Sequence, residues 1–218
     1  MQKLLVSSIF LYATIFPIAG TAMLSAATPE LFSITAPVAQ SWELILINAA
    51  NPVPADYLLE FVTLSNGNKV DKRIYPSLQL MFDTARAEGI FPRVNSGYRS
   101  HSEQQELYDE RINMYLSQGS TLEQARDLTS GWVAFPGTSE HEIAIAVDIG
   151  GDWVNSTSDE VYVWFANNAH KFGFILRYPE GKSHITGINY EPWHYRYVGD
   201  VATEIYEAGI TLEEYLLR

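Results

Sequence analysis

The chain has 218 residues, a net charge of −12 and no cysteine. This length suits one domain of ordinary size with an additional segment. An acidic chain without basic runs is poorly suited to coating nucleic acid or an anionic membrane surface by charge, so we expect no nucleic-acid partner. The lack of cysteine excludes disulfides, thiolate metal sites and a cysteine nucleophile, so any metal site must use His, Asp and Glu.

The N-terminal segment is apolar or small in nearly every position, and Lys3 is its one charged side chain. This pattern predicts a signal peptide or an uncleaved N-terminal membrane anchor over residues 1–27. Both alternatives export the rest of the chain, which is then secreted or anchored to the outer face of the membrane that it crosses. A buried core helix is the weaker alternative, because globular helices seldom run so long without charge. We expect a lead-in or tether over residues 28–50 and one folded domain over residues 51–218.

Apolar spacing and helix-breaking residues predict the elements of this domain in chain order. Ser102 and Gln105 have the spacing of a capping box, and so do Thr121 and Gln124. Strands and helices are mixed without a regular βαβ alternation, which favours an α+β fold with a small, mostly antiparallel sheet flanked by helices. We predict helices at 76–89, 102–118, from 121 onward, at 161–171 and twice near the C-terminus, and strands at 90–98, 143–149, 174–177 and 193–198.

Two short segments far apart in the sequence carry side chains that can bind a metal. His141 and Asp148 lie in the first, and Glu191 and His194 lie in the second. Two imidazoles and one aspartate are the ligand set of a catalytic zinc, which keeps a fourth position open for water, and a glutamate can take the proton of that water. One such residue is usually structural, but four together favour a metallohydrolase.

Strand geometry restricts how the first segment can be arranged. In a strand over 143–149, Asp148 shares one face with Ala144 and Ala146, and these small side chains leave room beside the carboxylate. The odd spacing between His141 and Asp148 puts them on opposite faces of a regular strand. We therefore expect His141 to fold back from the turn before this strand.

The second segment allows a similar argument. Glu191 and His194 are three residues apart and would face oppositely on a strand. Pro192 interrupts strand pairing between them, so we expect Glu191 in the loop that enters the strand. His194 is then the ligand on the strand, with Trp193 and Tyr195 on the opposite face.

Three longer motifs extend beyond these residues. They are SGYRSxxxQxxL from Ser96, PGTSEHxxxxAVDI from Pro136, and the stretch from Phe172 to Gly199 that includes EPWHYRYVG. Together they resemble the zinc D-alanyl-D-alanine carboxypeptidases of the VanY type, over roughly residues 50–217. These enzymes belong to a wider group that includes the lysostaphin-like peptidases and the Hedgehog signalling domain, which share a small α+β fold.

The resemblance implies a role for each matching residue. It implies three ligands for Zn²⁺, namely His141, Asp148 and His194. Glu191 matches the catalytic base, and Arg99 matches the arginine that contacts the scissile carbonyl oxygen. Ser139 and Gln104 match positions that line the substrate site.

The sequence departs from the family pattern at two positions. The family usually has Gly where this chain has Ala144, and Gln or a similar residue where it has Glu142. Because we expect Ala144 on the metal-facing side of its strand, its methyl group would narrow the pocket there. Neither departure removes a ligand or the base.

The activity that the resemblance implies is a zinc-dependent D,D-carboxypeptidase, which removes the C-terminal D-alanine of a peptidoglycan stem peptide by metal-activated water. The alternative within the same group is an L,D-carboxypeptidase, a D,D-dipeptidase or an endopeptidase on such stems. A further alternative is a zinc-containing wall-binding or signalling module without turnover, against which both Glu191 and Arg99 argue. We expect a monomer that contacts the membrane through its N-terminal segment if that segment is not cleaved.

Overall fold

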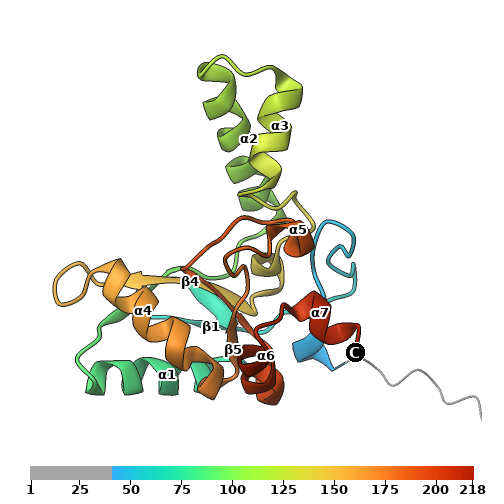
Figure 1. Ribbon diagram of the computed structural model, residues 1–218. Coiled ribbons are helices and arrows are strands. Elements are labelled where there is room, and N and C mark those ends of the chain that lie inside the picture. The colour runs from blue at the N-terminus through green and yellow to red at the C-terminus, as the bar shows by residue number, and fades with distance from the viewer. Residues whose placement is uncertain (1–40) are drawn as a thin grey trace, which may run out of the picture. The chain divides into compact units, whose positions relative to one another are not determined.

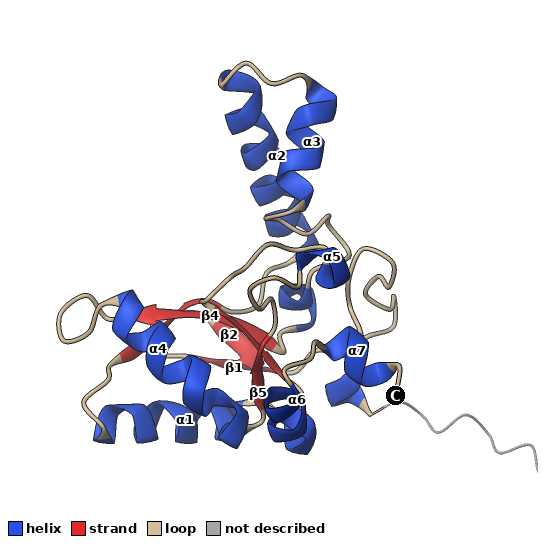
Figure 2. Cartoon of the chain, viewed as in Figure 1, coloured by secondary structure: helices blue, strands red, loops and turns tan. Residues whose placement is uncertain are grey.

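The computed structural model describes residues 41–218, and the predicted signal peptide or anchor over residues 1–27 lies outside them. None of the helices in this part of the chain is both long and apolar enough to cross a membrane. Figure 2 shows short strands surrounded by helices and loops. In chain order the elements are η1 (Trp42–Leu44), β1 (Phe61–Thr63), β2 (Lys69–Asp71), α1 (Tyr75–Ala87), β3 (Pro92–Ser96), α2 (His101–Ser117), α3 (Leu122–Ser130), η2 (Glu140–Ile143), β4 (Ala146–Gly151), α4 (Ser158–Asn168), η3 (Ala169–Phe172), β5 (Phe174–Leu176), α5 (Ser183–Thr186), β6 (His194–Tyr197), η4 (Gly199–Val201), α6 (Ala202–Ala208) and α7 (Leu212–Leu216).

The central sheet has four antiparallel strands in the order β3-β4-β6-β5, and β1 pairs with β2 in a separate ribbon. This arrangement confirms the predicted α+β fold with a small antiparallel sheet. The register places Asp148 of β4 opposite Ser96 of β3 on one side and His194 of β6 on the other. Side chains of paired residues project from the same face, so this row defines one face of the sheet.

Helices α1 and α4 pack on the opposite face of this sheet (Figure 1). Val147 and Ile149 point from β4 into the main core, where they meet Met81 of α1, Phe165 of α4 and other apolar side chains. Tyr195 of β6 enters the same core. The alternation of β4 therefore separates a buried apolar face from the face that carries Asp148, as its sequence pattern predicts.

The end of the predicted lead-in segment packs on this domain. Ile47 is 1% exposed and belongs to the main core. The guanidinium of Arg196 in β6 donates hydrogen bonds to the carbonyl oxygens of Glu43 and Ile45, at 3.0 and 2.7 Å. These contacts fix the backbone of residues 43–47 against the central sheet.

Helices α2 and α3 form a hairpin that projects from the sheet (Figure 1). The hairpin has a small core of its own, made by Tyr108, Ile112, Ala125 and Val133. This separate packing allows the hairpin to keep its form as it projects away from the main core.

Side-chain caps set the starts of the two hairpin helices. The predicted box between Thr121 and Gln124 is confirmed at the start of α3. The predicted box between Ser102 and Gln105 is wrong, because α2 begins at His101 and is capped by Ser100. Both serines stand three residues before a Glu or Gln, and the extended backbone of Ser100 decides which of them serves as the cap.

Candidate functional site

A short 3₁₀ helix, η2, carries the first site histidine. Ser139 caps it, and the Oγ of Ser139 accepts a hydrogen bond from the backbone N of His141 at 3.3 Å. The helix ends at Ala144, which has a left-handed backbone with φ of 60°. This reversal folds His141 back toward Asp148 on β4. The predicted strand over 143–149 is therefore too long at its start, because β4 begins only at Ala146.

The expected effect of Ala144 on the pocket is wrong. Ala144 is fully buried, lies outside the strand and does not line the cavity described below. Its carbonyl oxygen accepts a hydrogen bond from the backbone N of Asp71 at 2.9 Å. The left-handed backbone gives the physical reason for glycine at this place, because glycine adopts positive φ without steric cost. Alternation along a strand cannot predict the face of a residue that has left the strand.

A turn before β6 carries the second pair of site residues. Glu191, Pro192 and Trp193 precede the strand, and the backbone N of His194 donates to the carbonyl of Glu191 at 3.2 Å. Glu191 thus lies in the entering loop, as its sequence predicts. The expectation that Trp193 faces away from the site is wrong. It lies in the turn, where strand alternation does not apply, and it lines the same cavity as His194.

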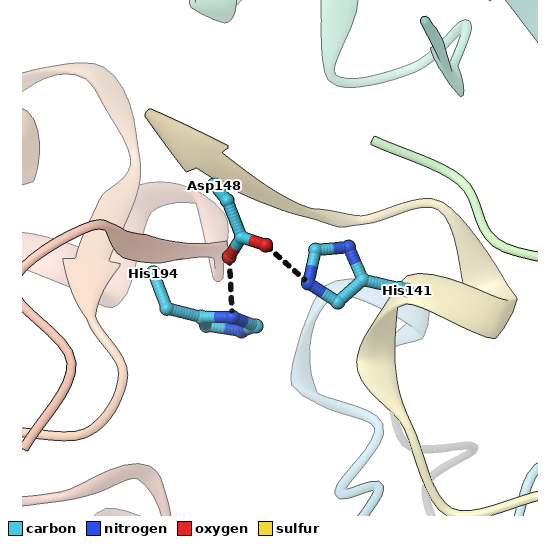
Figure 3. A group of neighbouring side chains, drawn as sticks. All are labelled: His141, Asp148 and His194. Carbon is cyan, nitrogen blue, oxygen red and sulfur yellow. Dashed lines mark hydrogen bonds and ion pairs between the residues drawn. The ribbon is translucent and has the colours of Figure 1, made fainter. Parts of the chain in front are cut away.

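The three expected ligands meet at one point (Figure 3). One ligand atom from each of His141, Asp148 and His194 lies within 4.8 Å of the other two. The Nδ1 of His194 is 3.0 Å from Oδ1 of Asp148, and the Nε2 of His141 is 3.3 Å from Oδ2. Figure 3 shows both imidazoles directed at the carboxylate. This spacing allows a single cation to contact all three groups.

The hydrogen bonds of His141 indicate that a cation fits there. Its Nδ1 lies 2.7 Å from the carbonyl oxygen of Gly97 and therefore donates to it, which leaves Nε2 with a lone pair. Nε2 is buried and has no hydrogen-bond partner within residues 41–218, although it faces the Asp148 carboxylate. Two electron-rich groups facing each other in a buried place need a positive charge between them. A metal ion bound by both would supply it.

The second histidine contacts a buried ionic network. Its Nε2 lies 3.4 Å from Oε2 of Glu140, and Oε1 of Glu140 accepts hydrogen bonds at 2.7 Å from Arg177 and from Arg196. Burial would raise the pKa of Glu140, but the two arginines outweigh it and hold that pKa far below its usual range. Glu140 is therefore a fixed carboxylate that orients the ring of His194.

Glu191 lies beside the ligand group and is almost fully buried. Its Oε2 is 3.7 Å from Nδ1 of His194. Burial raises the pKa of Glu191 to about 7, although the His194 charge opposes this. A carboxyl with a pKa near neutrality can both take and return a proton, which is the property of a general acid–base.

Arg99 is held firmly at the edge of the ligand group. Its Nε donates to Ser96 at 3.1 Å, its Nη1 to Gln104 at 2.7 Å and its Nη2 to Asp148 at 3.3 Å. Gln104 in turn donates from Nε2 to the carbonyl oxygen of Ala134 at 2.7 Å. The structure thus brings Arg99, Gln104 and Ser139 to the same place as the ligand group.

The three expected ligands line one open cavity of about 530 Å³, together with Glu191, Arg99, Gln104 and Ser139. The hairpin α2–α3 and the loop after it form one wall, and the segment from Tyr178 to His194 forms another. The lining residues are Arg99, Gln104, Leu107, Arg111, Tyr115, Trp132, Val133, Ala134, Ser139, His141, Asp148, Tyr178, Ile188, Glu191, Trp193 and His194.

Several residues in and beside the cavity were not predicted from the sequence. The ring centroid of Tyr178 lies 4.8 Å from that of His194, and Oε2 of Glu140 lies near Nε2 of the same histidine. Only the assembled fold shows either contact. Arg111 could have been found, because it follows Gln104 by seven residues on a predicted helix and thus shares its face.

A small antiparallel sheet that presents two histidines and an aspartate, with a buried glutamate and a fixed arginine beside them, is an arrangement typical of metallopeptidases of the α+β class. The family model described as VanY, D-alanyl-D-alanine carboxypeptidase, matches residues 67–200. The chain belongs to this family, as its motifs predict.

Known relatives agree with this assignment. A D-alanyl-D-alanine carboxypeptidase of Enterococcus faecalis is 53% identical over 178 residues, which are 81% of this chain and 66% of the relative, so the chain spans just under two thirds of it. The structure of VanYB in complex with D-alanine-D-alanine has a TM-score of 0.80 and 53% identity, over 81% of this chain and 98% of that one. A variant of a vancomycin-resistance D,D-pentapeptidase VanY in complex with Zn(II) has a TM-score of 0.79 and 53% identity, over 80% and 99%.

Proposed function

We propose that this chain is a zinc-dependent D,D-carboxypeptidase that removes the C-terminal D-alanine from peptidoglycan stem peptides. The observation that carries the proposal is the meeting of three ligand side chains with Glu191 and Arg99 in one cavity. Relatives that bind Zn(II) and D-alanine-D-alanine, at 53% identity, support the choice of metal and substrate.

In this proposal His141, Asp148 and His194 hold Zn²⁺, which when bound supplies a water of lowered pKa and polarises the scissile carbonyl. The carboxylate of Glu191 takes the proton of the attacking water and passes it to the nitrogen of the leaving D-alanine. The Arg99 guanidinium stabilises the negative charge that develops on the carbonyl oxygen, and its three hydrogen bonds keep it in place. Ser139 and Gln104 line the wall against which the peptide lies.

Digestion of defined stem peptides tests this function. The purified protein should release D-alanine from a pentapeptide, lose this activity with a chelator and regain it with Zn²⁺. Release of D-alanine from a tetrapeptide alone would indicate an L,D-carboxypeptidase, and release of a dipeptide would indicate a D,D-dipeptidase. Binding to the cell wall without release of any product would indicate a non-catalytic binding module.

Replacement of Glu191 separates metal binding from proton transfer. Glu191→Gln should keep zinc bound and lower kcat by at least about 100-fold, because proton transfer by a positioned carboxylate contributes roughly 10²–10⁴-fold. Metal content by atomic absorption and kcat on the pentapeptide measure the two effects. Activity near that of the unchanged protein would show that Glu191 is not the base.

The cellular setting is part of the same proposal. The domain over residues 51–218 would act as a monomer outside the cytoplasmic membrane, exported by the apolar segment over residues 1–27. The composition of that segment supports this setting. Cell fractionation with N-terminal sequencing would distinguish a cleaved signal peptide from a membrane anchor.

A further inference from the structure

One face of α2 lines the cavity over about three turns. Its lining residues are Gln104, Leu107, Arg111 and Tyr115, which follow one another by three, four and four positions. This spacing puts them on a single helix face. Gln104 is bound to Arg99 beside the ligand group, so the same face leads outward from the chemical centre to Arg111 and Tyr115.

The two arginines that line the cavity differ in their partners. Each of the three guanidinium nitrogens of Arg99 donates a hydrogen bond to a neighbouring side chain. Arg111 makes neither a hydrogen bond nor an ion pair with any residue of the range 41–218. It is partly buried in the cavity wall, where its charge attracts the Glu191 carboxyl without a direct ion pair.

The wall that carries Arg111 is held in place. Its neighbours Tyr108 and Ile112 are buried in the core of the hairpin. Beyond the end of α3, the backbone N of Asn189 donates to the carbonyl oxygen of Gly131 at 2.8 Å and joins the two walls of the cavity. Arg111 is thus a cation on a rigid helix, directed into a cavity whose walls are linked.

We propose that Arg111 is a specificity-determining residue that pairs with a carboxylate of the peptide substrate. This inference rests on the proposed function, because a carboxypeptidase substrate has a terminal carboxylate one residue beyond the scissile bond. A stem peptide has a second carboxylate on its glutamyl residue, with the same chemistry. Guanidinium binds carboxylate through two parallel hydrogen bonds, and a chain of net charge −12 needs a local cation to attract an anion.

Binding of three peptides to two variants tests the proposal. Arg111→Gln removes the charge, and Arg126→Gln is the matched control, because Arg126 is exposed on α3 of the same hairpin and does not line the cavity. The peptides are the pentapeptide, its C-terminal amide, and the form with the glutamyl carboxylate amidated. Calorimetry uses zinc-loaded protein with Glu191→Gln, so that binding is measured without turnover, and circular dichroism checks the fold.

Arg111→Gln should weaken binding of the unmodified pentapeptide roughly 10- to 100-fold, as expected for loss of a charged hydrogen bond, while Arg126→Gln leaves it unchanged. The loss should vanish for the one peptide whose paired carboxylate is amidated, and that peptide identifies the source. An equal loss on all three peptides, no loss for Arg111→Gln, or no measurable binding of any peptide would overturn the inference. Separately, an effect of Arg111 on binding with no hydrolysis by the protein that retains Glu191 would refute the proposed function alone.

Discussion

At Ala144 the backbone turns left-handed, with φ of 60°, within the segment that brings His141 to Asp148. A left-handed conformation costs a residue with a Cβ atom about 1–2 kcal/mol, which glycine avoids. The methyl group of Ala144 is buried away from the cavity. The departure from glycine therefore concerns the stability of the fold and leaves the shape of the pocket unaffected.

Ala144→Gly should keep the ratio of kcat/KM for pentapeptide and tetrapeptide unchanged. Its free energy of unfolding should change by less than about 1 kcal/mol, because relief of strain offsets the loss of a buried methyl group, which contributes about 0.8 kcal/mol. Ala146→Gly, in β4, is the control and should lose about 1 kcal/mol, because the strand has no such strain. Urea unfolding and steady-state kinetics measure both. A changed peptide preference in Ala144→Gly would contradict this account.

The raised pKa of Glu191 should make the free energy of unfolding of the metal-free protein depend on pH. Because burial raises its pKa to about 7, the folded chain holds a proton between pH 4.5 and pH 7 that the unfolded chain releases. Its contribution to stability is therefore present at low pH and is lost as pH rises through this window. Glu191→Gln should flatten this part of the profile of unfolding free energy in the presence of chelator. Profiles of equal slope would show that Glu191 is ionised in the folded protein.

At the scale of elements, the site depends on how η2 meets β6. The 3₁₀ helix η2 carries two glutamates, Glu140 and Glu142, one on each side of His141, and both are buried. Glu140 contacts His194, Arg177 and Arg196. Glu142 accepts a hydrogen bond from the backbone N of Gly137 at 2.7 Å and lies near the exposed His101, away from the ligands.

Glu140 and Glu142 form a matched pair that tests whether the contact between Glu140 and His194 affects zinc affinity. Glu140→Gln should weaken zinc binding by roughly 10- to 100-fold, because groups that orient a metal ligand typically have effects of this size. Glu142→Gln should leave zinc binding within about threefold of the unchanged protein. Competition with a chromogenic chelator gives both constants on protein shown to be folded. Similar affinities for the two variants would show that Glu140 does not orient His194.

At the scale of the whole described domain, buried charges link segments that are distant in the sequence. Arg177 lies between Glu140 of η2 and Glu213 of α7, with hydrogen bonds of 2.7 and 2.9 Å to the two oxygens of Glu213. Asn48, in the segment before β1, also donates to Glu213, at 3.3 Å. The C-terminal helix and the lead-in segment are thus joined behind the site.

The adjacent residues Glu213 and Glu214 allow this link to be measured. Glu213→Gln should lower the free energy of unfolding by roughly 3 kcal/mol, because it leaves the fully buried Arg177 short of negative charge. Glu214→Gln should lower the free energy of unfolding much less than Glu213→Gln does, because its pair with Lys182 is partly exposed and glutamine can keep the helix cap. Urea unfolding at neutral pH compares them. Equal losses would show that the buried link contributes no more than the surface pair.

Local patterns predicted most of the secondary structure because they depend on neighbouring residues. Examples are the apolar spacing that predicts α1, whose residues Leu78, Met81, Phe82 and Ala85 are buried, and the cap of Thr121. Prediction failed where the backbone left its regular form. Ala144 turns left-handed and Trp193 lies in a turn, and alternation along a strand places both on the wrong face. Of the site, the sequence predicted the residues that chemistry requires, namely those that can bind a metal or move a proton.

By itself, the sequence determined the family, the α+β class and the set of His, Asp and Glu side chains near the centre, because these depend on residue types at fixed spacings. The tertiary structure decided that Glu140 contacts His194, that Ala144 lies outside the pocket and that Arg111 faces the cavity with no hydrogen bond or ion pair to any described residue. These features arise from contacts between η2, α2 and β6, whose distances in space are set by packing and cannot be read from spacing along the chain.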